Sequence, residues 1–189
     1  MNNSIHIIKD NNLAIRSNII GMFGISAALL VAFYYQLVLF ELPCPLCLLQ
    51  RVGLILIGLG FLCNIRFGIK SVHYSLALIG CVATGLIAAR QMFLHILPGD
   101  NGYGSTLMGL HFYTWALIAS LVAVVAIAVM MMLSVEFPGT EKNFLVSLCG
   151  KISIMVFTLM IVANLISTVL ECGSGQCADN PTYYQLLVK

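Results

Sequence analysis

The sequence predicts an all-α integral membrane protein, a helical bundle of about five transmembrane helices. Hydrophobic residues make up 60% of the 189-residue chain and charged residues only 8%, whereas soluble domains carry about 25% charged residues. Five long apolar runs have lengths that suit helices crossing about 30 Å of hydrocarbon. The formal net charge is only +2, and no basic patch of the kind that binds nucleic acids is present. We therefore expect membrane lipid, and no nucleic acid, around this chain.

The first three apolar runs cover residues 17–40, 48–64 and 72–96. The first run is longer than the core of a signal peptide, which is about 7–15 residues, and no small-residue cleavage site follows it. We therefore predict a retained helix over 17–40. The second and third runs are separated by a short turn over 66–70, so their helices should lie antiparallel.

The second half of the chain predicts two further helices. A glycine-rich loop over 97–109 leads into an apolar run at 110–133. A polar segment with the breaker Pro138-Gly139 follows, and then an apolar run at 152–170. We expect one domain over 1–189, in which four helices form a core, the fifth is added at the C-terminal side, and residues 171–189 form a polar tail.

Basic residues predict the orientation of the five spans. An odd number of spans places the two ends of the chain on opposite sides of the membrane, and cytoplasmic loops are enriched in Lys and Arg. Six of the nine basic residues fall on the side of the N-terminus. They are Lys9, Arg16, Arg66, Lys70, Lys142 and Lys151. We therefore predict a cytoplasmic N-terminus and a tail on the opposite side.

A pair of cysteines two residues apart, Cys44 and Cys47, precedes the second span. This spacing is typical of redox-active dithiols, although it also occurs as half of a zinc site. Pro45 suits the first turn of a helix, where its missing N–H is not needed. Cys47 would then lie in that turn, where free N–H groups favour a thiolate. Arg51 follows one turn later on the same face, so a cation should lie beside the thiolate.

A second close pair, Cys172 and Cys177, follows the fifth span. With five spans both pairs face the non-cytoplasmic compartment, where disulfides persist. Glycines between Cys172 and Cys177 offer little shielding, so this disulfide should be exposed and exchangeable. The remaining cysteines are predicted to be inert buried thiols. They are Cys63, Cys81 and Cys149.

Two basic residues on the outer side interrupt apolar stretches. For Arg51 we favour a functional role, because an intramembrane cation beside a redox cysteine can stabilise negative charge. Arg90 is a weaker candidate, since a long side chain near a helix end also reaches the headgroups without any further function. His95 and His111 border the outer loop, where they are expected as interfacial polar residues.

At this point the motifs carry a resemblance to a family. Residues 43–51, Pro-Cys-Pro-Leu-Cys-Leu-Leu-Gln-Arg, resemble the first-loop motif of the DsbB family of membrane quinone-linked disulfide oxidases. Residues 89–98 are similar to that family's stretch at the outer end of its third helix, and the resemblance covers roughly residues 17–133. The chain departs from the family in three respects, the first being its five spans where the usual family member has four. The second cysteine pair follows a fifth span rather than the third, and Gln91 occupies a position where the family often has a histidine.

The resemblance implies a bacterial cytoplasmic (inner) membrane protein with a periplasmic C-terminus. It implies that a soluble DsbA-like thioredoxin-fold oxidase passes two electrons to Cys172–Cys177. From there they would pass to Cys44–Cys47, and Cys47 would deliver them to a quinone, either ubiquinone or menaquinone, near Arg51 and Arg90. Two alternatives remain: a conduit that carries reducing equivalents outward, and a non-enzymatic metal-binding protein that uses the four outer cysteines.

Overall fold

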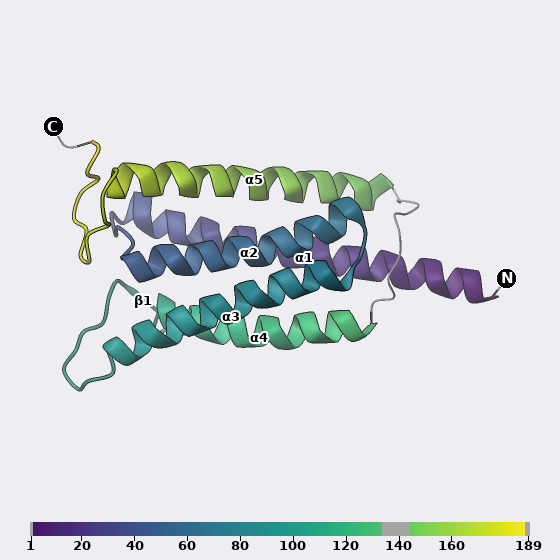
Figure 1. Cartoon of the computed structure of the whole chain (residues 1–189), viewed down its shortest axis with the longest axis horizontal. Helices are drawn as coiled ribbons and strands as arrows, with labels where there is room; N and C mark the ends of the chain where they lie inside the picture. Colours follow the sequence, from purple (N-terminus) through teal and green to yellow (C-terminus); the bar gives the residue numbers. More distant parts are fainter. Residues whose placement is uncertain (1, 134–143, 188–189) are drawn as a thin grey trace.

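The computed structural model describes residues 2–133 and 144–187, and within them it confirms a bundle of five long helices (Figure 1). The helices are α1 (Asn2–Val38), α2 (Pro45–Phe67), α3 (Ser71–Leu94), α4 (Phe112–Leu133) and α5 (Phe144–Cys172). Each contains a stretch that is long and apolar enough to cross a membrane. The expected breaker at Pro138-Gly139 lies outside the described residues.

The helices extend beyond several of the apolar runs. The chain is helical from Asn2, although the span in α1 begins at Leu13, and α5 begins at Phe144 rather than at residue 152. An apolar run marks the part of a helix that can lie in the hydrocarbon core of a membrane. The helix itself continues for as long as its backbone N–H groups hydrogen-bond to the carbonyl oxygens four residues earlier. Sequence patterns therefore located the spans better than the helix ends.

The loop between α3 and α4 holds a small hairpin that the sequence did not predict. Its strands are β1 (Thr106–Leu107) and β2 (Leu110–His111), paired antiparallel. The two residues between them, Met108 and Gly109, have φ angles of 53° and 80°. Positive φ at both positions is what a two-residue hairpin turn of type I′ requires. The hairpin shortens the glycine-rich loop and holds it near the ends of the helices.

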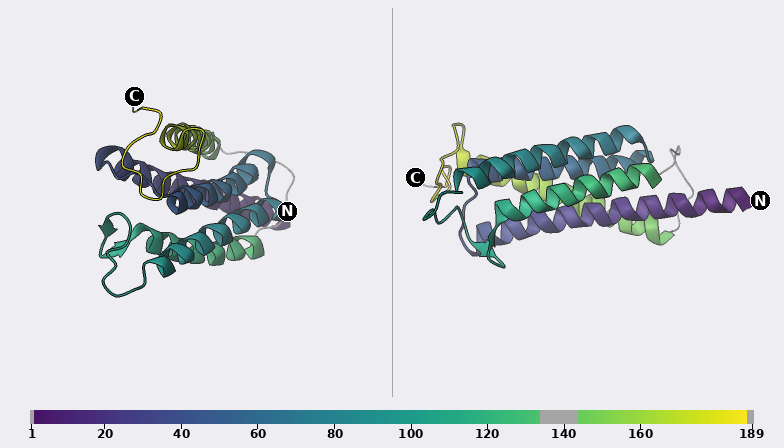
Figure 2. Two further views of the ribbon diagram at one scale, coloured as in Figure 1. Left: turned by 60° about the vertical axis from the view of Figure 1, so that its left-hand side comes forward. Right: turned by 90° about the horizontal axis from the view of Figure 1, so that it is seen from below.

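Helix α2 lies at the centre of the packing. It contacts α1, α3 and α5, while α4 packs chiefly against α3 (Figures 1 and 2). Small residues permit the close approach of α2 and α3. A Cβ atom on Gly60 would lie 2.6 Å from the carbonyl oxygen of His73, and one on Gly80 would lie 2.7 Å from the backbone nitrogen of Ile57. Glycines therefore allow α2 and α3 to approach each other closely.

A polar network ties α1, α2 and α3 together near the N-terminal end of the bundle. The amide of Asn18 donates to the hydroxyl of Tyr74 at 2.8 Å, and the amide of Asn64 donates to Asn18 Oδ1 at 3.0 Å. Asn64 Oδ1 also accepts from the backbone N–H of Lys70 at 3.1 Å. Every member has a partner, as buried polar groups normally do. This end of the bundle is held by satisfied hydrogen bonds.

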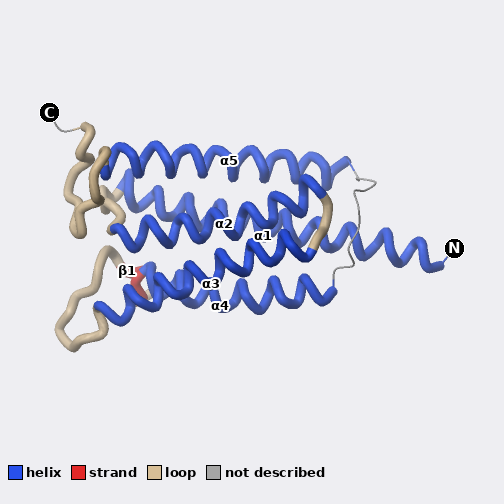
Figure 3. Tube along the Cα trace, viewed as in Figure 1, coloured by secondary structure: helices blue, strands red, loops and turns tan. Residues whose placement is uncertain are grey.

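The opposite end of the bundle gathers the loops that matter for function. The connection between α1 and α2, the loop with the hairpin and the C-terminal tail all lie there, as the tan segments of Figure 3 show. The two ends of the chain lie at opposite ends of the bundle (Figure 1). Both close pairs of cysteines therefore belong to one end of the molecule.

Candidate redox site

Cys44 and Cys47 form the start of α2. Cys44 is the N-cap, with extended backbone, and its sulfur accepts a hydrogen bond from the backbone N–H of Cys47 at 3.2 Å. Its carbonyl oxygen accepts from the N–H of Leu48 at 3.0 Å. Pro45 occupies the first turn, as the sequence indicated. Both cysteines are free thiols; Cys44 is buried and Cys47 is half-buried.

Gln91 reaches the two sulfurs from α3. Its side chain is 1% exposed. Its amide nitrogen lies 3.3 Å from Cys44 Sγ and 3.6 Å from Cys47 Sγ. The amide oxygen of Gln91 is held by Gln50, whose side-chain nitrogen donates to Gln91 Oε1 at 2.8 Å. The residue that marks a departure from the family motif is therefore a direct neighbour of the dithiol.

The two thiols are not equivalent. Hydrogen bonding with Cys47, together with burial, raises the pKa of the Cys44 thiol well above its usual range. Cys44 therefore keeps its proton when one thiol of the pair ionises, and the negative charge falls on Cys47. This agrees with the position of Cys47 in the first turn of α2, where backbone N–H groups stabilise an anion.

Arg51 is buried and faces the interior. It is 7% exposed, and its guanidinium donates to Gln36 Oε1 at 2.6 Å and to the carbonyl oxygen of Ala32 at 3.2 Å. It also lies over the ring of Phe33, with its central carbon 5.3 Å from the ring centroid. Its charge acts on the Cys47 thiol. The guanidinium is therefore held inside the bundle rather than extended toward its surface.

Gln36 links this cation to the C-terminal half of the chain. Its amide nitrogen donates to the hydroxyl of Ser167 in α5 at 2.6 Å and to the hydroxyl of Tyr184 in the tail at 3.0 Å. Sequence reasoning missed Gln36 and Gln91 as site residues. The sequence feature that could have identified them is a polar amide side chain within an apolar span, because polar residues inside a membrane often have a function.

The structure does not bring Arg90 to the cysteines. Its side chain is exposed on α3, although its neighbour Gln91 points inward. Successive residues of a helix point in directions about 100° apart, so only one of the two can face the dithiol. In the loop after α3, the backbone N–H of Gly102 donates to Asp100, and His95 is paired with Asp100 at 3.0 Å; these two hydrogen bonds lower the pKa of Asp100.

Loop residues cover the connection between α1 and α2. The hydroxyl of Tyr103 donates to the carbonyl oxygen of Leu42 at 2.7 Å. Glu41 accepts hydrogen bonds from the backbone N–H of Ser105, at 3.1 Å, and from its hydroxyl. Burial raises the pKa of Tyr103, which remains a neutral donor. The loop thus fixes the backbone on the N-terminal side of Cys44.

Cys172 and Cys177 are joined in a disulfide at the end of α5. The expectation that this disulfide is exposed was wrong for one sulfur: the Cys172 residue is 5% exposed, whereas Cys177 is half-buried. The reason is that the tail folds back over the helix end. The backbone N–H of Leu186 donates to the carbonyl oxygen of Leu170 at 3.1 Å, and that of Gln185 to the carbonyl of Glu171 at 3.4 Å.

The remaining cysteines differ in burial. Cys81 is buried, Cys63 is half-buried and Cys149 is exposed. The prediction of three buried thiols therefore holds for Cys81 and was wrong for Cys149. Cys149 lies on a face of α5 that does not pack against another helix, where an apolar thiol needs no burial within the protein to be kept from water in a bilayer.

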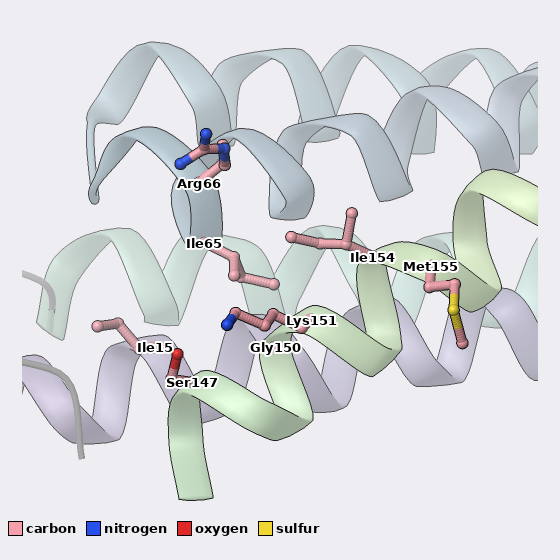
Figure 4. A pocket seen from close by; sticks show the side chains of 8 residues that line it. All are labelled: Ile15, Ile65, Arg66, Ser147, Gly150, Lys151, Ile154 and Met155. Atoms are coloured by element: carbon pink, nitrogen blue, oxygen red, sulfur yellow. The ribbon is translucent and has the colours of Figure 1, made fainter. Parts of the chain in front are cut away.

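A hollow of about 430 Å³ lies at the far end of the bundle from the dithiol. Its wall comes from α1, α2 and α5, and Arg66 and Lys151 are among the lining side chains (Figure 4). This hollow is too distant from Cys44 to take part in thiol chemistry. Among the residues that the structure describes, no group of three or more His, Cys, Asp or Glu side chains could hold a metal ion.

The first three helices match a known family. The family model described as "Disulfide bond formation protein DsbB" matches residues 16–103. A protein of Marinobacter nauticus named "Disulfide bond formation protein B" is 42% identical over 87 residues, which cover 42% of this chain and 51% of that protein. A protein of Hahella chejuensis with the same name is 39% identical over 74 residues, covering 37% of this chain and 45% of that protein.

A third relative extends the match slightly. "Disulfide bond formation protein B 1" of Pseudomonas savastanoi is 36% identical over 101 residues, covering 50% of this chain and 60% of that protein. The chain thus spans about half the length of the curated relatives that it matches. No solved structure matches the chain. The matched family segment, residues 16–103, contains Cys44, Cys47, Arg51 and Gln91 and stops before α4 and α5.

Proposed function

Because residues 16–103 match the DsbB family model and resemble curated disulfide bond formation proteins, we propose that the chain is a membrane thiol oxidase of this family that supports disulfide bond formation in exported proteins. The observation that carries this proposal is the arrangement at the start of α2. A free dithiol at a helix N-terminus lies between a buried amide and a buried cation, which is the environment that a reactive cysteine needs. A second cysteine pair is tied to the same end through Tyr184 and Gln36.

The proposed reaction passes two electrons through the two pairs. A soluble DsbA-like thioredoxin-fold dithiol reduces the Cys172–Cys177 disulfide and becomes a disulfide itself. The reduced tail then reduces a Cys44–Cys47 disulfide, so that the tail disulfide forms again and the two thiols at α2 carry the electrons. Each exchange forms one disulfide and breaks one, and two protons follow the two electrons.

A lipid-soluble quinone fits the α2 site as the acceptor. Arg51 has five N–H donors and uses two contacts on neutral oxygens within the described chain, which leaves donors for an anionic oxygen. Leu49 and Val52, on either side of it, are exposed and offer an apolar approach from the bilayer. When bound, a quinone supplies the two-electron oxidant that returns the dithiol to a disulfide. Arg51 would stabilise negative charge, and Gln91 would hold both sulfurs in place.

The proposed orientation places both pairs outside the cytoplasm, in the compartment where exported proteins acquire disulfides. It rests on the six basic residues on the N-terminal side of the spans. A reporter fused after Lys189 that is active only outside the cytoplasm would support this orientation. Activity only in the cytoplasm would exclude the proposed exchange with exported proteins.

The proposal is tested with purified protein under anaerobic conditions. Reduced thioredoxin-fold oxidase and ubiquinone-1 or menadione are mixed with the full chain, and the absorbance of the quinone is followed. We expect one quinone to be reduced for each pair of thiols oxidised. A rate no higher than that without the protein, with both quinones, would exclude the proposed function.

A further inference from the structure

Glu171 is a buried carboxylate that lacks a hydrogen-bond partner in the described part of the chain. It lies in the last turn of α5, directly before Cys172, and is 2% exposed. Within residues 2–133 and 144–187, neither of its carboxylate oxygens has a hydrogen-bond partner. Burial of a carboxyl group without a hydrogen bond is strongly unfavourable. A group left in this condition calls for an explanation beyond packing.

Arg51 and Tyr103, which interact electrostatically with Glu171, direct their hydrogen bonds to other groups. From α2, Arg51 and Cys47 are the groups whose charges act on it, and the Arg51 guanidinium donates to α1 instead. From the loop, Tyr103 is also electrostatically coupled to Glu171, but its hydroxyl donates to a backbone carbonyl. Glu171 therefore interacts electrostatically with Arg51, Cys47 and Tyr103 but, within the described residues, is hydrogen-bonded to none of them.

Gln36 of α1 and Tyr184 of the tail also form their hydrogen bonds with groups other than Glu171. Gln36 is neutral and is held by Arg51, Ser167 and Tyr184. The tail contributes Tyr184, whose hydroxyl accepts from that amide. The contrast with the opposite end is clear, because the buried amides Asn18 and Asn64 there have their partners. The buried carboxylate that lacks a hydrogen bond thus lies at the end of the bundle that holds the two cysteine pairs.

We propose that Glu171 carries the proton between the two cysteine pairs during their exchange. The inference rests on the proposed function. When the tail dithiol reduces the Cys44–Cys47 disulfide, Cys172 and Cys177 lose two protons as their disulfide forms, and Cys44 and Cys47 gain two. Glu171 is the chain neighbour of Cys172 and acts electrostatically on Cys47. Its free oxygens accept a proton from a tail thiol and return it to a departing sulfur.

This role does not follow from the family match. The match ends at residue 103, whereas Glu171 lies on α5 beside the cysteine pair that the matched segment lacks. A helix that brings a second dithiol to the α2 site also has to bring a path for its protons, because water is excluded from the buried Cys172. Glu171 supplies that path from the same helix end.

The test follows the oxidation of the fully reduced chain. Protein reduced with dithiothreitol and freed of it is mixed anaerobically with excess ubiquinone-1 or menadione, then quenched by thiol alkylation and analysed by mass spectrometry. Loss of the Cys44 and Cys47 thiols reports the first step, which depends on the proposed function. Loss of the Cys172 and Cys177 thiols reports the exchange between the pairs.

In Glu171→Gln we expect an unchanged first step and an exchange slower by about a hundredfold, the lower end of what general acid–base catalysis contributes. The parental exchange rate should rise with pH as the carboxyl ionises and then level off, because only the carboxylate accepts a proton. The glutamine variant should lack this rise, and Glu171→Asp should restore part of the rate. Asp179→Asn, an exposed acid of the same tail, should behave as the parent.

The outcomes separate the two proposals. Absence of the first step in the parent would overturn the proposed function, and the inference with it. A normal first step with a parental exchange rate and pH profile in Glu171→Gln would overturn the inference alone, and would leave Glu171 a structural counter-charge. If Glu171→Gln does not fold, the parent and Glu171→Asp decide: an exchange rate that shows no carboxyl titration in either would overturn the inference.

Discussion

The two cysteine pairs are built differently, although both lie at one end of the bundle. Cys44 and Cys47 are held by two helices, with backbone contacts within α2 and the amide of Gln91 from α3. Cys172 and Cys177 are held chiefly by each other and by the tail that folds over the end of α5. The first pair has a buried cation beside it, whereas the second has a carboxylate that lacks a partner.

This difference indicates a division of roles. A thiolate that transfers electrons to an acceptor needs fixed donors and a nearby positive charge, which the α2 pair has. A pair that exchanges with a protein partner needs one reachable sulfur, and Cys177 is the more accessible of its pair. The four predictions below test this division, in order of decreasing expected effect.

Replacement of either cysteine at α2 should have the largest effect. Cys44→Ser and Cys47→Ser should each reduce thiol-dependent quinone reduction to background, because a single thiol cannot cycle through an intramolecular disulfide. The matched control replaces Cys63, Cys81 and Cys149 together by alanine and should keep the parental rate. Loss of activity in the control at normal membrane abundance would show that one of these thiols takes part.

Replacement of either tail cysteine should abolish only part of the activity. Cys172→Ala and Cys177→Ala should each stop the oxidation of a soluble thioredoxin-fold partner. Quinone reduction driven by dithiothreitol should continue, because this small reagent reaches the α2 pair directly. If either variant oxidises the protein partner at the parental rate, the tail disulfide is only a staple and the proposed division of roles is wrong.

Removal of the cation should slow the acceptor step without stopping it. Charge-assisted contacts contribute about 1.5–3 kcal/mol, so Arg51→Ala should reduce quinone about ten- to a hundredfold more slowly. Arg51→Lys should be intermediate, since it keeps the charge and loses the planar fork. Arg90→Ala should have a smaller effect than Arg51→Ala, because Arg90 is exposed. An equal effect of the two alanine variants would contradict the special role of Arg51.

Replacement of Gln91 should have the smallest effect of the four changes. Gln91→Leu removes the donor shared by the two sulfurs, and one hydrogen bond contributes about 1 kcal/mol, so the rate of quinone reduction should fall about fivefold. Gln50→Leu leaves the contacts of Gln91 with sulfur intact and should have a smaller effect. Stopped-flow measurement of both variants checks this order, and a larger loss in Gln50→Leu would contradict it.

The sequence predicted the parts of the site that local rules control. The five apolar runs, the proline at the start of α2 and the register of Cys47 with Arg51 all follow from helix geometry. The sequence did not predict that Gln91 meets the sulfurs, because this contact depends on how α3 rotates against α2. Small residues such as Gly80 control that close packing, and no local pattern encodes its angle.

The C-terminal region was the least predictable part. The glycines between Cys172 and Cys177 suggested an exposed disulfide. Instead, backbone hydrogen bonds from Gln185 and Leu186 return the tail to the helix end. Such bonds use main-chain groups that every residue has, so their pairing leaves no signature in the sequence.

Direct exchange between the two pairs is the central claim, and trapping of the mixed disulfide tests it most directly. Four variants each retain one cysteine of the α2 pair and one of the tail pair, with Cys63, Cys81 and Cys149 replaced by alanine. After mild oxidation in the membrane and non-reducing digestion, mass spectrometry should find at least one variant in which residue 44 or 47 is bonded to residue 172 or 177 within a single chain. Absence of this intramolecular link in all four folded variants would contradict the account.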